Sequence, residues 1–386
     1  MPNAILEAGK LGQSFWYDTL SRKMLTSGEL KAMVERDGLT GVTSNPTIFA
    51  KAMGEGADYD SQLRTLVASG VSDPKALYEA LAIEDIRGAA AVLKPVYDRT
   101  SGADGYVSLE VSPHLARDTA GTIAEARRLF RAVGRPNVMI KVPGSPEGMP
   151  AIEELVAAGV NINVTLLFGL GAYRACAEAH VAGLERLASS GGDPARVAGV
   201  ASFFLSRIDT VVDERLAKAL AAQPGDTRRA ELEGLRGQVA IANAKVARAD
   251  YLTMVAGPRW QALAARGARP QRLLWASTGT KNPAYSKTMY VDPLIGPDTV
   301  NTVPAETYQI FRDHGQARRT LDDGLAEARA TLAALGEVGI SLDEVTDGLL
   351  AAGIESFSKS FDALLALLDR KRQALVGVSA AESPSP

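Results

Sequence analysis

The chain has 386 residues and a formal net charge of −3, with 42 basic and 45 acidic residues spread along its length. This balance excludes the long-range field that draws a protein onto nucleic acid or an anionic membrane, so we expect small-molecule partners. The single cysteine, Cys176, excludes an intramolecular disulfide and a cysteine-built zinc site, and we expect it to be a small buried residue on a helix.

Short apolar or β-branched runs alternate with longer amphipathic segments, which is typical of a parallel sheet with helical crossovers. In chain order, the expected strands are residues 14–18, 38–44, 105–111, 137–142, 160–168, 196–204, 272–277 and 299–303. Eight such strands favour a closed barrel over an open sheet. The prediction is an α/β protein, a (β/α)₈ TIM barrel with additional N- and C-terminal helices.

The segments between the strands are predicted helices, such as 119–134, which Asp118 can cap and Gly134 can end. Residues 227–256 and 320–374 are long helical patterns that exceed a minimal barrel, so we expect helices across its outside or over one mouth. No repeat or linker divides the chain. We expect one domain over residues 1–375 and a disordered tail at 376–386.

One strand carries a lysine where apolar residues are expected. Lys141 lies within Val-Met-Ile-Lys-Val-Pro at 138–143. Burial there would remove the hydration of the ammonium and favour the neutral amine, which is a nucleophile. Taken alone, such a lysine is more often a structural residue that extends to the surface.

The fifth strand strengthens the catalytic interpretation. Asn161, Asn163 and Thr165 alternate with apolar residues, which places a polar set on one face of the strand. Polar groups inside a barrel are costly unless they have partners or a ligand. We therefore expect this face to line a substrate pocket.

Other polar residues fall near the carboxyl ends of strands, where the active sites of TIM barrels lie. Taken one at a time, these residues have more common explanations. A single carboxylate usually forms a structural ion pair or caps a helix, Asn45-Pro46 usually forms a turn, and a single basic residue usually lies on the surface. Their coincidence beside Lys141 points to a site. These residues are Asp18, Glu110, Ser202, Arg207, Lys281, Asn45 and the Gly279-Thr280 turn.

Several other chemistries lack their motifs. The three histidines, His114, His180 and His314, have no metal-ligand spacing, and there is no Gly-x-Ser-x-Gly elbow. There is also no Walker loop and no strand-linked Gly-x-Gly-x-x-Gly. We expect no metal, nucleotide or nicotinamide cofactor.

Six motifs in order resemble those of the transaldolases, over residues from about 10 to 375. They are GVTSNPTIF at 41–49, SLEV at 108–111, IKVPG at 140–144, NVTLLF at 163–168, ASFFLSRID at 201–209 and WASTGTKNP at 275–283. The sequences of the last two motifs resemble those of the bacterial monofunctional branch with extended helices. The resemblance implies a TIM barrel that is circularly shifted relative to other Schiff-base aldolases.

The resemblance also implies roles for individual residues. Lys141 corresponds to the lysine that forms a Schiff base with a ketose phosphate, Asp18 to the general base, and Glu110 with Thr165 to the pair that works through a bound water. The expected substrate-binding residues are Thr43, Asn45, Asn163, Ser202, Arg207, Ser277 and Lys281. Lys281 departs from the family, because many members carry an arginine there.

The expected partners are phosphorylated ketose and aldose sugars. Two rival functions remain: a Schiff-base sugar-phosphate aldolase that releases free dihydroxyacetone, and a non-catalytic sugar-phosphate sensor. The N-terminal segment lacks the apolar core of a signal peptide and no apolar run is long enough to span a bilayer, so we expect a cytoplasmic protein. We expect a monomer or a homodimer.

Overall fold

The computed structural model describes residues 3–54, 56–222 and 225–381. Eight parallel strands form a closed barrel in the order of the sequence, as predicted. The strands are β1 Gln13–Tyr17, β2 Gly41–Val42, β3 Tyr106–Glu110, β4 Val138–Pro143, β5 Ile162–Leu167, β6 Gly199–Phe204, β7 Arg272–Ala276 and β8 Thr299–Val303. Each lies within or next to its predicted range, because buried parallel strands read as apolar runs.

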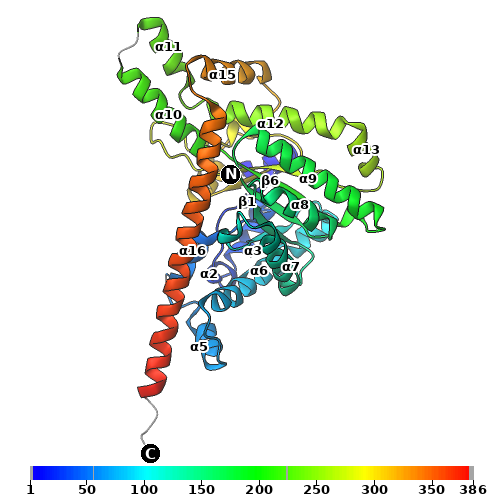
Figure 1. The fold of residues 1–386 in the computed structure, drawn as a ribbon, viewed down its shortest axis with the longest axis vertical. Coiled ribbons are helices and arrows are strands. Elements are labelled where there is room, and N and C mark those ends of the chain that lie inside the picture. Colours follow the sequence, from blue (N-terminus) through cyan, green and yellow to red (C-terminus); the bar gives the residue numbers. More distant parts are fainter. Residues whose placement is uncertain (1–2, 55, 223–224, 382–386) are drawn as a thin grey trace, which may run out of the picture.

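Helices surround the barrel, as the alternating pattern predicts (Figure 1). The prediction for α7 is confirmed in detail: Asp118 accepts a hydrogen bond from the amide of Gly121, and Gly134 ends the helix with φ at 61°. The helices before β6 are α1 Ala4–Lys10, α2 Arg22–Thr26, α3 Glu29–Asp37, α4 Pro46–Gly54, α5 Asp60–Ala68, α6 Pro74–Arg99, α7 Thr119–Val133, α8 Gly148–Ala157 and α9 Leu170–Ser189.

The two long helical patterns of the C-terminal half are each interrupted once. Residues 227–256 form α11 and α12, which are separated where Arg236 adopts an extended conformation. Residues 320–374 form most of α15 and α16, which are separated near Gly339 with φ at 84°. The helices after β6 are α10 Ser206–Ala221, α11 Asp226–Leu235, α12 Val239–Ala256, α13 Pro258–Ala264, α14 Ala305–His314, α15 Leu325–Glu337 and α16 Leu342–Ala381.

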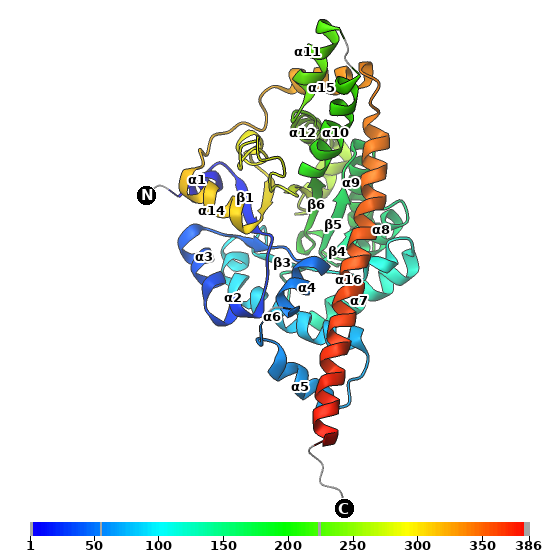
Figure 2. The ribbon, with the colours of Figure 1, turned by 90° about the vertical axis from the view of Figure 1, so that its left-hand side faces the viewer.

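Helix α16 spans most of the length of the molecule and crosses the side of the barrel (Figures 1 and 2). It packs against α4, α5, α6 and α10, which come from both halves of the chain. The sequence thus correctly predicted accessory helices at the C-terminus. The expected tail at 376–386 overlaps the end of α16, and its last residues, 382–386, lie outside the described residues.

The barrel is regular except between β5 and β6, where the register shifts between Val164 and Leu167. Leu166 adopts a left-handed conformation with φ at 61°, which is costly for a branched residue outside a specific setting. The irregularity directly follows Thr165 at the carboxyl end of β5. Such departures from regular geometry are common beside active sites.

No described helix is both long and apolar enough to cross a membrane.

Candidate active site

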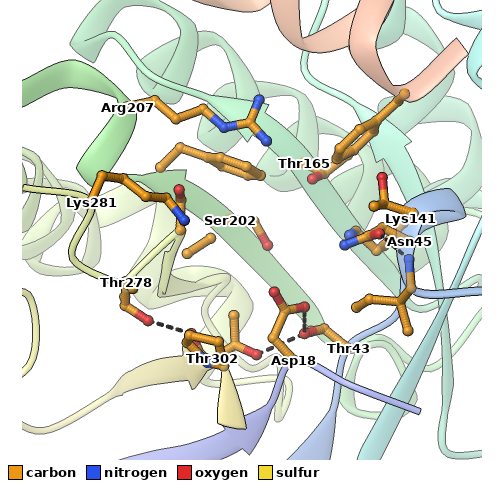
Figure 3. Close-up of a pocket in the computed structure, with 18 residues that line it drawn as sticks. Asp18, Thr43, Asn45, Lys141, Thr165, Ser202, Arg207, Thr278, Lys281 and Thr302 are labelled. Atoms are coloured by element: carbon orange, nitrogen blue, oxygen red, sulfur yellow. Dashed lines mark hydrogen bonds between the residues drawn. The ribbon is translucent and has the colours of Figure 1, made fainter. Parts of the chain in front are cut away.

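A pocket of about 230 Å³ opens at the carboxyl end of the barrel strands. Its polar walls come from residues within or just after different strands (Figure 3), while α16 supplies one aromatic residue. The lining residues are Asp18, Thr43, Asn45, Thr47, Ile48, Lys141, Thr165, Ser202, Phe204, Arg207, Ala276, Ser277, Thr278, Gly279, Lys281, Thr302, Pro304 and Phe357. Nine of the eleven site residues predicted from the sequence line this one pocket; the exceptions are Glu110 and Asn163.

Lys141 lies on β4, with a side chain that is only 6% exposed. The strand register places Lys141 beside Glu110 of β3 and Asn163 of β5. Its Nζ donates a hydrogen bond of 3.0 Å to the carbonyl of Ser44 and lies 3.4 Å from Oε2 of Glu110. A buried amine held by so few partners is well placed to react with a carbonyl group in the pocket.

Asp18 directly follows β1, and its amide donates to the carbonyl of Val303. Its carboxylate accepts a hydrogen bond of 2.6 Å from the hydroxyl of Thr43. Burial raises the pKa of Asp18, and this effect outweighs the opposing influence of Lys141, the Thr43 hydroxyl and more distant cations. A carboxylate with a raised pKa is a stronger base than an exposed aspartate.

Glu110, at the end of β3, is 4% exposed and lies behind Lys141 rather than on the pocket wall. Burial raises its pKa, while the Lys141 ammonium opposes that shift. Neither carboxylate oxygen has a hydrogen-bond partner among the described residues. Glu110 also borders a small internal cavity on its far side, together with Tyr78 and Glu125.

Two polar residues of β5, Thr165 and Asn163, have different roles. Thr165 lines the pocket, and its buried hydroxyl has no hydrogen-bond partner within the described part of the chain. Asn163 does not reach the pocket, and instead accepts a 2.7 Å hydrogen bond from Ser202 and donates one of 3.0 Å to Ser108. Asn163 therefore orients Ser202, which does line the pocket.

The prediction that Asn161 shares this pocket-forming face is wrong. Asn161 precedes β5 and lies at the opposite end of the barrel. Its amide donates to the carbonyls of Pro136 and Val138, and its oxygen accepts from the amide of Ala198. The side chain satisfies backbone groups where three neighbouring strands begin, a role that strand alternation does not distinguish from a pocket.

Two basic residues occupy the side of the pocket away from Lys141 (Figure 3). Arg207, in the first turn of α10, lies over two aromatic rings, with its guanidinium carbon 5.5 Å from the centroid of Phe204 and 5.9 Å from that of Phe357. It forms no ion pair or hydrogen bond with a side chain or carbonyl of the described residues. With Lys281 it leaves cationic donors available to an anionic ligand.

Local contacts and backbone geometry hold two further residues that were predicted for the site, Asn45 and Ser277. Asn45 accepts a hydrogen bond of 2.9 Å from the amide of Ile48 and so caps the first turn of α4. Ser277 has φ at 54°, and its hydroxyl lies 2.9 Å from that of Ser206. Both side chains remain at the pocket wall.

Sequence reasoning missed several lining residues, including Thr302, Thr278 and Phe357. Thr302 lies near the carboxyl end of a correctly predicted strand, so the rule that identified Ser202 could have found it. Phe357 gives no such signal, because an aromatic residue on a long amphipathic helix is normally part of the core.

No cluster of three or more metal-ligating side chains occurs among residues 3–54, 56–222 and 225–381. The described site instead combines a buried amine, two carboxyl groups with raised pKa values and a separate pair of cations. This arrangement can form an imine with a ketone, move protons on either side of it, and hold an anionic group at a distance.

Comparisons with known proteins find similar sequences over nearly the whole chain. The sequence profile of the transaldolase/fructose-6-phosphate aldolase family matches residues 15–368. A transaldolase of Trichodesmium erythraeum is 45% identical over 97% of this chain and 99% of its own length. Transaldolases of Thiobacillus denitrificans and Thermobifida fusca are 49% and 47% identical, over 94% and 97% of this chain and 99% of each relative.

Proposed function

The chain belongs to the transaldolase/fructose-6-phosphate aldolase family, and we propose that it is a transaldolase of the pentose phosphate pathway. The reaction moves a dihydroxyacetone unit from sedoheptulose 7-phosphate to glyceraldehyde 3-phosphate, which gives erythrose 4-phosphate and fructose 6-phosphate. Near full-length similarity to proteins named transaldolase favours this activity over the aldolase that shares the family name. The observation that carries the mechanism is Lys141, buried between Glu110 and the pocket.

The first step joins the substrate to Lys141. The neutral amine attacks C2 of the ketose phosphate, and the carbonyl oxygen takes up a proton to give a carbinolamine. Loss of water from the carbinolamine then gives an iminium ion. Glu110, whose carboxylate lies 3.4 Å from the Lys141 amine, supplies the proton that leaves with this water, acting through a water molecule that the unpartnered Thr165 hydroxyl binds.

The second step breaks the bond between C3 and C4. Asp18 removes the proton of the C4 hydroxyl, the C4 oxygen becomes the carbonyl of the departing aldose phosphate, and the electron pair of the broken bond moves into the iminium. The three-carbon fragment remains on Lys141 as an enamine. The acceptor aldose then reacts with the enamine by the reverse sequence, and water finally hydrolyses the new imine.

Substrate recognition follows from the arrangement of the pocket, in which the two cationic side chains lie on the side away from Lys141 (Figure 3). Arg207 and Lys281 bind the terminal phosphate, where the fork of donors on arginine matches phosphate oxygens and lysine adds a point charge. The ketol hydroxyls lie among the polar groups nearer Lys141. These groups are Thr43, Asn45, Ser202 and Ser277, with Asn163 holding Ser202 in place.

Several wider properties belong to the same proposal. Residues 1–375 act as one domain, the protein works in the cytoplasm as a monomer or homodimer, and its partners are phosphorylated ketoses and aldoses rather than nucleic acid. No cofactor is needed, because a Schiff base supplies the electron sink that the carbon–carbon cleavage requires.

An assay of products tests the proposed function against both rivals. Purified protein is mixed with fructose 6-phosphate, with or without erythrose 4-phosphate, and the products are followed by mass spectrometry. Sedoheptulose 7-phosphate that forms only with the acceptor supports transaldolase activity. Free dihydroxyacetone formed without the acceptor would instead identify an aldolase, and the absence of both products would identify a sugar-phosphate sensor.

A further inference from the structure

Side chains from three neighbouring strands form a chain of hydrogen bonds, which runs through two threonine hydroxyls and ends at Asp18. Strand β1 lies between β8 and β2, and Trp16 of β1 pairs with Thr302 of β8. The hydroxyl oxygens of Thr302 and Thr43 are 2.7 Å apart, and the Thr43 hydroxyl donates to Asp18 over 2.6 Å. Figure 3 shows the three side chains at the pocket wall, with dashed lines that join Thr43 to both Thr302 and Asp18.

The direction of these hydrogen bonds follows from counting hydrogens. A threonine hydroxyl has one hydrogen to donate, and an ionised carboxylate only accepts. When Asp18 is ionised, the hydrogen of Thr43 points to Asp18 and cannot also point to Thr302. The hydrogen between the two threonines must then belong to Thr302, so the chain runs from Thr302 through Thr43 to the carboxylate.

We propose that Thr302 is a positioning residue for the general base, because its hydroxyl fixes the direction in which Thr43 donates to Asp18. This inference rests on the proposed role of Asp18. Thr302 is 3% exposed and Thr43 is 2% exposed, so water competes little for these hydrogen bonds. Hydrogen bonds in such a chain strengthen one another by polarisation, which favours the ionised form of the base.

The backbone also holds Thr302 in place. Its carbonyl accepts a hydrogen bond of 2.7 Å from the hydroxyl of Thr278, which follows the neighbouring strand β7. The carbonyl of the next residue, Val303, accepts from the amide of Asp18. The position of Thr302 relative to Asp18 is therefore set by main-chain contacts that a change of its side chain leaves intact.

Other charged groups also act on Asp18, and the test must hold them constant. Lys141, Arg207 and Lys281 favour its ionised form, and the charge of Asp18 in turn raises the pKa of Glu110. None of these four residues is hydrogen-bonded to Thr302. Replacing Thr302 with valine, which has nearly the same shape, removes one hydroxyl and leaves all four charges in place.

The test compares Thr302→Val and Thr302→Ser with the wild type across the acidic limb of the kcat/KM profile, which reports the essential base of the free enzyme. We expect Thr302→Val to lower kcat/KM at neutral pH by about 3–10-fold. Loss of the relay disfavours ionised Asp18, so the acidic limb should move to higher pH by a few tenths of a unit to about one unit. Thr302→Ser, which retains the hydroxyl, should restore the wild-type profile.

A matched control is Thr122→Val on α7. Thr122 is also buried, and its hydroxyl also makes a single hydrogen bond, 2.9 Å long, to the carbonyl of Leu115. This variant should leave the acidic limb unchanged. An unmoved limb in Thr302→Val, or the same shift in Thr302→Ser, would overturn the proposal. Failure of the proposed function has a different signature, because the wild type itself would then make no sedoheptulose 7-phosphate.

Discussion

Arg207 gives the clearest test of how the pocket recognises phosphate. Its guanidinium lies over the rings of Phe204 and Phe357, and its donors have no protein acceptor among the described residues. A hydrogen bond to a charged group contributes about 1.5–3 kcal/mol, and each 1.4 kcal/mol corresponds to a factor of about ten. Because Lys281 remains, we expect Arg207→Ala to raise the KM for fructose 6-phosphate by roughly 10–30-fold.

The assay separates phosphate binding from chemistry at Lys141. Initial rates are measured with fructose 6-phosphate at a high fixed concentration of erythrose 4-phosphate. In parallel, borohydride traps the imine that free dihydroxyacetone forms with the enzyme, a reaction that needs no phosphate contact. We expect the trapping rate of Arg207→Ala to stay within about a factor of two of the wild type, since this contact is absent from that step.

Arg248 offers a matched control for the loss of a buried arginine. Its guanidinium carbon lies 4.9 Å from the ring centroid of Tyr251, and it pairs with Asp322; none of these residues lines the pocket. Arg248→Ala should lower stability without changing the KM for fructose 6-phosphate. If Arg207→Ala slowed the two reactions equally, its defect would be general, and the assignment of Arg207 to phosphate would be refuted.

Three further predictions follow from buried groups. Glu110→Gln keeps the shape of Glu110 but cannot shuttle a proton, so turnover should fall by a factor on the order of 10²–10⁴ while thermal unfolding changes little. Phe357→Leu removes one ring over Arg207 and should raise the KM for sugar phosphates a few-fold but leave dihydroxyacetone trapping unchanged; an effect on trapping would contradict this role. Burial lowers the pKa of His180 to about 4, so the unfolded chain binds a proton at higher pH than the folded protein does. Stability should therefore fall as pH falls from about 6.5 towards 4, by about 2 kcal/mol between pH 7 and pH 5, and His180→Gln should lose that part of the pH dependence in urea unfolding.

The fold was predictable because its strands are buried on both sides. Their apolar runs stand out against amphipathic helices, and this contrast identifies even β2, which is only two residues long. The interruptions within the long helical patterns were less visible. They lie beside Gly237, with φ at 67°, and Gly339, with φ at 84°, and a single glycine within a helical pattern is also tolerated in a continuous helix.

The site was predictable where a polar residue interrupts an apolar strand, as Lys141 does. The site was less predictable where only the alternation of polar and apolar residues along a strand was used. A strand has polar positions at both ends, and only its carboxyl end meets the pocket. Asn161 illustrates this ambiguity, since its amide satisfies backbone groups at the far end of the barrel. Phe357 could not be predicted, because its contribution depends on where α16, far along the sequence, passes beside the pocket.

The central claim is that Lys141 carries the three-carbon unit, and a trapping experiment tests it most directly. The protein is treated with borohydride in the presence of fructose 6-phosphate, digested, and mapped by mass spectrometry, with Lys141→Ala as the control. The account predicts a reduced dihydroxyacetone adduct on the peptide that contains Lys141, and neither adduct nor turnover in a Lys141→Ala variant that is still folded. An adduct on another lysine, or turnover near the wild-type rate in Lys141→Ala, would contradict it.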